Sequence, residues 1–143
     1  GITPLSSCDV GLVVGRPDGL MIPIVRSVDA GDLAALAKQR AALVEAARTG
    51  GLTHEALQGG ATSLSNLGNT RVDEFSAVIP LPHSSILAVG RAAPRPFVVQ
   101  EQLVSCPTLK LCLSVDHRVM DGAPAAEFLG RIAAALENPE TLA

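Results

Sequence analysis

The sequence predicts a two-layer α+β domain in which a mixed β-sheet carries helices on one face. Short β-branched runs at the amino end precede one long amphipathic helix, further β-rich runs follow, and a second helix closes the chain. Because strands and helices do not alternate strictly, a doubly wound parallel sheet is disfavoured. A chain of 143 residues can bury one modest core, so we expect a single domain over residues 1–143.

The first elements are expected to form a hairpin. Residues 9–15 (DVGLVVG) and 19–26 (GLMIPIVR) are apolar runs, and Arg16-Pro17-Asp18-Gly19 between them is a strong turn signal. Pro23 has no N–H to donate to a ladder, which predicts an edge or a bulge for its segment.

Helical periodicity begins after the hairpin. Apolar residues recur at three- and four-residue spacing from the region of Asp29 and Asp32 to about Arg48. Either aspartate can cap this helix, and Gly50-Gly51 is expected to end it. A short second helix is expected over residues 53–60.

The remaining chain is expected to be mainly β-structure. Apolar and β-branched runs separated by proline-rich turns at 80–82 and 93–96 predict strands at 62–66, 77–79, 85–91, 97–102 and 103–115. The last of these delivers the chain to Asp116-His117. Residues 122–136 then form a closing helix with an apolar stripe.

Composition narrows the classes of function. With three Phe, no Tyr, no Trp and a net charge of −3, neither base stacking nor attraction to nucleic acid or anionic membrane is expected. Cys8, Cys106 and Cys112 lack metal-ligand spacing and are expected to be reduced. No run approaches the roughly 18 apolar residues of a membrane span. A content of 48% hydrophobic against 17% charged residues predicts apolar surface that another subunit covers.

The segment at residues 114–122 carries the clearest chemical signal. An apolar strand ends in Asp116-His117-Arg118, and a histidine between a strand end and a helix start is well placed as a general base. Asp121, four residues later, can hold the turn or pair with an arginine, and Gly122 permits a tight helix entry. Spacing alone still favours the simpler alternative, in which His117 ends a strand and Asp121 caps a helix.

Ser65 and Asn66 form a second candidate pair. A hydroxyl and an amide at a strand end can donate hydrogen bonds to an oxyanion, although Ser-Asn before Gly more often makes an ordinary turn. His54 and His83 are expected at the surface. Histidines this scattered argue against a metal site, and a Ser-His-Asp hydrolase lacks its Gly-x-Ser-x-Gly elbow.

Five stretches resemble the catalytic domain of the dihydrolipoamide acyltransferases, the E2 components of 2-oxo acid dehydrogenase complexes. DHRVMDG at 116–122 matches the family signature Asp-His-Arg-x-x-Asp-Gly at every fixed position, and chloramphenicol acetyltransferase carries a related His-x-x-x-Asp-Gly. The other stretches agree in order and spacing: PDGLMIPIVR at 17–26, GGATSLSNLG at 59–68, DEF at 73–75 and ILAVG at 86–90. The resemblance implies a chloramphenicol acetyltransferase-like fold.

The resemblance also implies acyl transfer between a lipoyl-lysine arm, supplied by a lipoyl domain, and the substrate coenzyme A. His117 would take the proton from the coenzyme A thiol, because the thiolate is the nucleophile. Ser65 would donate a hydrogen bond to the oxyanion, worth roughly 3 kcal/mol. Asp121 would orient the site through an ion pair, and no metal is needed. The expected coenzyme A contacts are Asn66, Arg118 and Gly122.

In this family the site lies between subunits of a trimer, with the histidine from one chain and the hydroxyl from its neighbour. The resemblance implies a homotrimer within a larger core, working with E1 and E3 components. The expected compartment is the bacterial cytoplasm, or the mitochondrial matrix in a eukaryote.

The sequence departs from the family pattern at some positions. Thr62 stands where the family usually has Phe, and Asn69-Thr70-Arg71 replaces a more apolar turn. We expect the family's preceding segment, with the usual arginine partner of Asp121, to lie outside these residues. A non-catalytic core or scaffold component and a free-standing acyltransferase remain alternatives. The acyl group (acetyl, succinyl or branched-chain) and the core size stay open.

Overall fold

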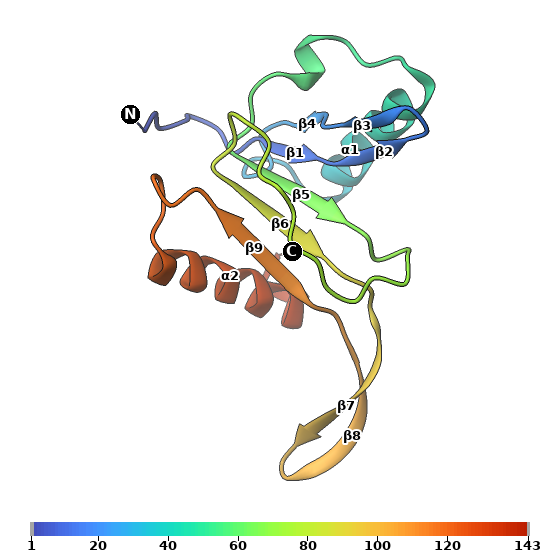
Figure 1. Ribbon diagram of the computed structural model, residues 1–143, viewed down its shortest axis with the longest axis vertical. Helices are drawn as coiled ribbons and strands as arrows, with labels where there is room; N and C mark the ends of the chain where they lie inside the picture. Colours follow the sequence, from blue (N-terminus) through green and yellow to red (C-terminus); the bar gives the residue numbers. More distant parts are fainter. Residues whose placement is uncertain (1, 143) are drawn as a thin grey trace.

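The computed structural model describes residues 2–142 and shows, within them, one five-stranded sheet, two two-stranded sheets and two α-helices (Figure 1). The strands are β1 (Val10–Leu12), β2 (Val14–Arg16), β3 (Gly19–Met21), β4 (Ile24–Val25), β5 (Thr62–Asn66), β6 (Ser85–Val89), β7 (Ala93–Val99), β8 (Gln102–Thr108) and β9 (Leu111–Val115). The helices are α1 (Leu33–Thr49) and α2 (Gly122–Glu137), and the 3₁₀ turns are η1 (Glu55–Leu57) and η2 (Pro139–Leu142). The predicted α+β class is confirmed.

The large sheet is mixed, in the order β4-β1-β5-β6-β9. β5 pairs in parallel with both β1 and β6, whereas β4 and β9 pair antiparallel at the two edges. In this register Ser85 lies between Thr62 and Val115, and Val89 lies between Asn66 and Leu111. The carboxyl end of β9 therefore lies beside the amino ends of β5 and β6.

The amino-terminal hairpin forms as predicted but divides between two sheets. β2 and β3 pair around the turn at Pro17-Asp18, while β1 and β4 join the large sheet. Pro23 lies in the break between β3 and β4, where its carbonyl accepts a hydrogen bond from the Leu12 amide at 2.8 Å. The proline thus occupies a position where its missing N–H costs no ladder bond.

Helix α1 begins and ends at the predicted signals. The Asp32 carboxylate accepts a hydrogen bond from the Ala35 amide at 2.7 Å, and Gly50 ends the helix in the left-handed region with φ 79°. The helix packs against β2 and β4, and Ala47 is fully buried. The helix expected over residues 53–60 is only the single turn η1.

The strand expected at residues 77–79 is wrong. This segment pairs with no strand and instead crosses one face of β9, where Glu74, Ser76 and Ala77 contact Lys110, Cys112 and Ser114. Alternate residues of a strand share a face, so Cys112 and Ser114 of β9 point the same way, and Lys110 lies just before the strand. Leu111, on the other face, lines a groove with Ala133 and Leu136 of α2. The segment and α2 therefore cover opposite faces of β9.

Two further predictions fail at the ribbon formed by β7 and β8. Residues 93–96, expected as a turn, are the start of β7, and residues 103–115, expected as one strand, divide into β8 and β9. The ribbon projects away from the body of the molecule (Figure 1) and turns at Gln100-Glu101, both with positive φ. A two-stranded ribbon has two outer edges, so prolines can lie in it where no donor is required.

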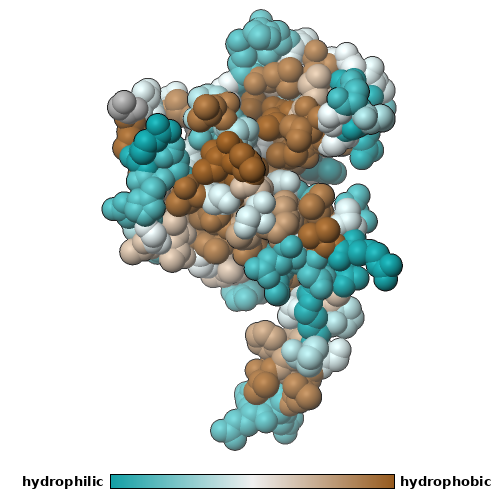
Figure 2. Space-filling view, viewed as in Figure 1, coloured by the Kyte–Doolittle hydropathy of each residue, from teal (hydrophilic) through white to brown (hydrophobic). Residues whose placement is uncertain are grey.

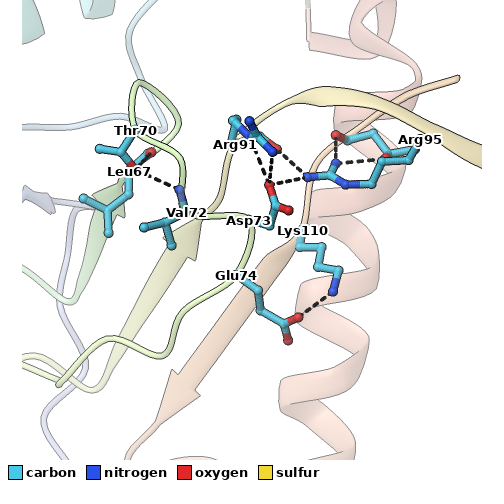
Figure 3. A network of polar contacts seen from close by, with 9 residues as sticks. Leu67, Thr70, Val72, Asp73, Glu74, Arg91, Arg95 and Lys110 are labelled. Atoms are coloured by element: carbon cyan, nitrogen blue, oxygen red, sulfur yellow. Dashed lines mark hydrogen bonds and ion pairs between the residues drawn. The ribbon is translucent and has the colours of Figure 1, made fainter.

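Asp73 holds the base of the ribbon (Figure 3). Its carboxylate accepts hydrogen bonds from Arg91 at 3.0 Å and from Arg95 at 2.8 Å, and Arg95 also donates to Thr108. The bonds from Arg91 hold the pKa of the Asp73 carboxyl below its usual range, with Arg95 contributing less. Nearby, Lys110 pairs with Glu74 at 2.7 Å.

Apolar side chains remain at the surface of the chain. Figure 2 shows hydrophobic residues, coloured brown, on the face in view, both on the main part of the molecule and on the β7–β8 ribbon. The most exposed large apolar side chains include Val78, Leu81, Leu103, Val98 and Leu20. Within residues 2–142, no helix combines the length and apolar character that crossing a membrane requires.

Candidate active site

His117 lies in the turn between β9 and α2. The Asp116 amide donates to the Ser84 carbonyl at 2.8 Å, which continues the β6–β9 pairing by one more bond. The Asp116 carbonyl then accepts from the amides of Val119 and Met120, at 2.9 and 3.1 Å, which closes the turn. The sheet therefore fixes where the turn begins and leaves its outer residues in solvent.

The His117 ring has one nitrogen paired and one free. Its Nδ1 lies 3.4 Å from the Asp121 carboxylate, and both side chains are nearly four-fifths exposed. Within residues 2–142, no hydrogen bond occupies Nε2. In the neutral ring, an Nδ1–H directed at Asp121 leaves the Nε2 lone pair able to accept a proton. Asp121 also stands at the N-cap of α2, although its side chain makes no capping bond.

Arg118 folds back onto Asp116 within the same turn. Its guanidinium donates to both carboxylate oxygens, the shortest bond being 2.6 Å, and its amide donates to the same group at 2.9 Å. These bonds lower the pKa of Asp116 to about 2. The side chain expected to contact coenzyme A is thus engaged with its own turn, with 82% of its surface exposed.

Ser63 and Ser65 share one face of β5 but have different surroundings. Ser63 is 1% exposed, and its hydroxyl is hydrogen-bonded to the His83 ring. The Ser65 hydroxyl has no hydrogen-bond partner within the described residues, and no buried side-chain oxygen there lacks a partner. The Ser65 oxygen must therefore keep access to solvent, although the residue as a whole is only 9% exposed. Of these two serines, Ser65 is the one available to a substrate.

His83 is buried, so the expectation of a surface position is wrong. The residue is 5% exposed, and both ring nitrogens are engaged, with Nε2 lying 2.7 Å from the Gly59 carbonyl and Nδ1 bonded to Ser63. Because a carbonyl only accepts, Nε2 carries a hydrogen, and in the neutral ring Nδ1 accepts from the serine hydroxyl. A serine and histidine this inaccessible cannot attack a substrate as a nucleophile–base pair. His54 is exposed, as expected.

The fold does not bring Ser65 and His117 together within one chain. Ser65 lies near the carboxyl end of β5, whereas His117 follows the carboxyl end of the antiparallel β9, two strands away. Along the strands, Ser65 is three residues from the level at which β9 ends, and across the sheet it is two strands away. Each of these separations amounts to about 10 Å. For both side chains to act on one bound acyl group, each must lie within hydrogen-bond distance of it, and the combined separation is far larger than that allows.

The remaining candidate residues divide between the same two ends of the sheet. Asn66 ends β5 beside Ser65, exposed, and its side-chain oxygen accepts from the Gly68 amide at 2.7 Å. Gly122 begins α2, with open space where a Cβ would lie. Among the residues that the structure describes, no three His, Cys, Asp or Glu side chains gather as metal ligands.

The family model for the 2-oxoacid dehydrogenases acyltransferase (catalytic domain) matches residues 2–143. The chain belongs to this family. Among curated relatives, the acetyltransferase component of the pyruvate dehydrogenase complex from Rhizobium meliloti (strain 1021) is 40% identical over 92% of the chain, and that from Rickettsia bellii (strain RML369-C) is 36% identical over 94%. The chain covers only 29% and 32% of those relatives.

Solved catalytic cores of this acyltransferase family share the fold. A dihydrolipoamide acetyltransferase from Azotobacter vinelandii superimposes with a TM-score of 0.91 at 33% identity, covering 96% of this chain and 57% of that one. The cubic core of a pyruvate dehydrogenase multienzyme complex gives 0.91 at 34% identity, with the same coverage. The chloramphenicol acetyltransferase-like fold implied by the resemblance is thus confirmed.

Proposed function

We propose that the chain carries the chemical groups of a dihydrolipoyllysine acetyltransferase, with His117 as the base and Ser65 as the oxyanion donor. One observation carries this proposal. The Azotobacter vinelandii structure addresses a serine, a histidine and an asparagine in that enzyme's catalytic mechanism, the serine 52 positions before the histidine and the asparagine four after it. Ser65, His117 and Asp121 have the same spacing, with aspartate in place of asparagine.

The geometry of the two groups suits this chemistry. His117 Nε2 takes the proton from the coenzyme A thiol, and the thiolate attacks the carbonyl carbon of the acyl thioester on dihydrolipoyl-lysine. The free Ser65 hydroxyl donates to the oxyanion that forms. When this intermediate collapses, the carbon–sulfur bond to the lipoyl group breaks, and the departing sulfur takes the proton from His117. Asp121 keeps Nδ1–H oriented throughout.

The site is proposed to form between two copies of the chain. The separation of Ser65 from His117 prevents one copy from supplying both groups, and the exposed apolar side chains offer surface for contact between copies. The cubic core of the related complex is an assembly of this kind of domain. We therefore propose a homotrimer within a larger core, served by a lipoyl domain and by E1 and E3 components. Asn66, Arg118 and Gly122 are proposed to contact coenzyme A.

Transfer from acetyl-, succinyl- and branched-chain acyl-coenzyme A to dihydrolipoamide, measured with the complete polypeptide, tests the reaction and the acyl group. Names of the relatives favour acetyl. We expect His117→Ala to lower kcat by about 10²–10⁴-fold and Ser65→Ala by about 10²–10³-fold. His54→Ala and Ser76→Ala, both at exposed positions, serve as matched controls. Full activity of His117→Ala would refute the assigned base.

Mixing the two inactive variants tests the site between copies. In a randomly mixed oligomer, about a quarter of the sites combine an intact His117 from one copy with an intact Ser65 from the next. Activity near that fraction of the wild type is expected after coassembly. A mixture as inactive as its components would show that one copy supplies both groups.

A further inference from the structure

The buried histidine, which the acyl-transfer chemistry leaves unused, lies at a junction of the fold. Its ring fits between two glycines: a Cβ on Gly11 would lie 2.6 Å from the His83 Cε1 atom, and one on Gly60 would lie 2.5 Å from Nε2. Neither distance is compatible with a real side chain, so both positions need glycine while the ring is present. Gly60 also has φ +95°, which favours glycine independently.

The hydrogen bonds of His83 act on the strand that carries the candidate oxyanion donor. Nε2 holds the Gly59 carbonyl, and Nδ1 holds the Ser63 hydroxyl near the start of β5. Ser65 lies two residues further on the same face, so holding the backbone of β5 at Ser63 also holds the part of the strand from which Ser65 projects.

Ser84, the residue after His83, connects the start of β5 to the turn that contains His117. Ser84 donates its amide and its hydroxyl to the Ala61 carbonyl, at 3.0 and 2.9 Å. Its own carbonyl accepts the Asp116 amide at 2.8 Å, one residue before His117. Gly60, Ala61, Ser84 and Val119 line a common cavity of about 760 Å³, so these segments meet in one place.

We propose that His83 is a positioning residue for acyl transfer. Its ring is packed between two glycines and makes two hydrogen bonds, and it thereby fixes the place where the start of β5 meets the loop that holds the His117 turn. This inference rests on the proposed function for its catalytic consequence, but its structural part does not. In the assembled enzyme, each copy supplies a serine to one site and a histidine to another, and His83 sets the placement of both. The histidine touches no substrate in this arrangement.

Two substitutions separate positioning from simple filling of the core. His83→Gln keeps one donor for Gly59 and one acceptor for Ser63, whereas His83→Leu fills similar volume and makes neither bond. Ser63→Ala removes one bond and leaves the ring in place, which provides a milder variant if His83→Leu does not fold. His54→Leu, at an exposed histidine, is the matched control.

Hydrogen exchange of the complete polypeptide gives a readout independent of catalysis. In His83→Leu we expect amides of residues 61–66 and 116–120 to exchange about tenfold faster or more, with helix α1 unchanged, because local opening need not spread to distant elements. Ser63→Ala should show the same pattern more weakly, and His83→Gln should restore protection. Unchanged exchange in both segments, or acceleration that includes α1 equally, would overturn the proposal.

Kinetics supply the second readout. We expect His83→Leu to lower kcat by about 10- to 100-fold, the effect of a misplacement near 1 Å, while KM for coenzyme A changes little. His83→Gln should recover most of the loss. Equal losses in both variants, or wild-type turnover in His83→Leu, would overturn the positioning role. If the wild-type enzyme transfers no acyl group, the proposed function fails, and the exchange pattern alone decides whether His83 fixes the two segments.

Discussion

Replacing Gly90 with alanine is expected to destabilise the fold strongly, although it adds one methyl group. Gly90 is buried between β6 and β7, and a Cβ there would lie 2.0 Å from the Asp73 carbonyl oxygen and 2.7 Å from its carbon. Both opposing atoms are backbone, so no side-chain rotation can relieve the clash. The two segments must move apart by roughly 1 Å or more.

The magnitude follows from what holds these segments together. Overpacking of a tight interior site costs about 1–3 kcal/mol, and the rigid backbone on both sides places this site at the upper end. Separation also strains the bond from the Arg91 amide to the Val72 carbonyl, now 2.9 Å, which adds about 1 kcal/mol. We expect a loss near 4 kcal/mol in the free energy of unfolding, or a fall in Tm of about 10 °C.

Urea unfolding at fixed protein concentration measures this change, since any association would shift the apparent stability. Gly130→Ala is the matched control. Gly130 lies exposed within α2 with nothing within 4 Å of the added Cβ, so the same substitution should stabilise the chain by about 0.5–1 kcal/mol. A Gly90→Ala protein within about 1 kcal/mol of wild type would refute the reasoning from close backbone approach.

Three further outcomes are expected. Asp32→Ala should cost about 1 kcal/mol in urea unfolding by removing the cap of α1, and Asp32→Asn, which keeps an acceptor, should cost much less; equal losses would contradict the capping role. The pKa of Asp116 is lowered from 3.8 to about 2 by Arg118, so its stabilisation is present above pH 3.8 and is lost as pH falls through about 2. The stability difference between wild type and Asp116→Asn should accordingly vanish over that window, and a difference persisting below it would argue against this ion pair as its source. Asp121→Asn should retain the proposed acyl transfer within about tenfold, because an amide oxygen still accepts from His117; a loss as large as that of His117→Ala would show that the negative charge is required.

Features with local signals were predictable from the sequence. The α1 helix has its cap at Asp32 and its left-handed glycine at Gly50, both within a turn of the helix ends. The motif at residues 116–122 likewise predicts a strand end, a turn and a helix start from adjacent residues, and the structure has this order. Such features depend on short-range hydrogen bonds, which sequence spacing describes directly.

The β7–β8 ribbon was mispredicted because the meaning of a proline in a strand depends on which strands pair beside it. Prolines at 94 and 96 indicate a turn when a central strand is assumed, but β7 and β8 pair only with each other. The tight turn at Gln100-Glu101 has positive φ at both residues without the glycine or asparagine that normally signals it. Neither the strand that contains these prolines nor the turn at Gln100-Glu101 can be predicted until the pairing of β7 with β8 is known.

The burial of His83 was missed for a related reason. The residue lies in a proline-bounded loop, and its covering groups, Gly11 and Gly60, are distant in sequence. A signal was nevertheless present, since paired glycines before a strand indicate close approach by another group. Spacing could not tell which group approaches.

The alternation of β5 explains how two similar serines acquire different uses. Ser63 and Ser65 share a face, so local sequence makes them equivalent, and only the loop that reaches Ser63 distinguishes them. Because His83 covers the first serine and nothing within the described residues bonds the second, the hydroxyl nearer the end of the sheet stays free for its proposed role as oxyanion donor. The antiparallel β9 then carries His117 to the opposite end. The same sheet that prepares both groups therefore prevents one chain from using them together, which makes assembly a requirement of the proposed chemistry.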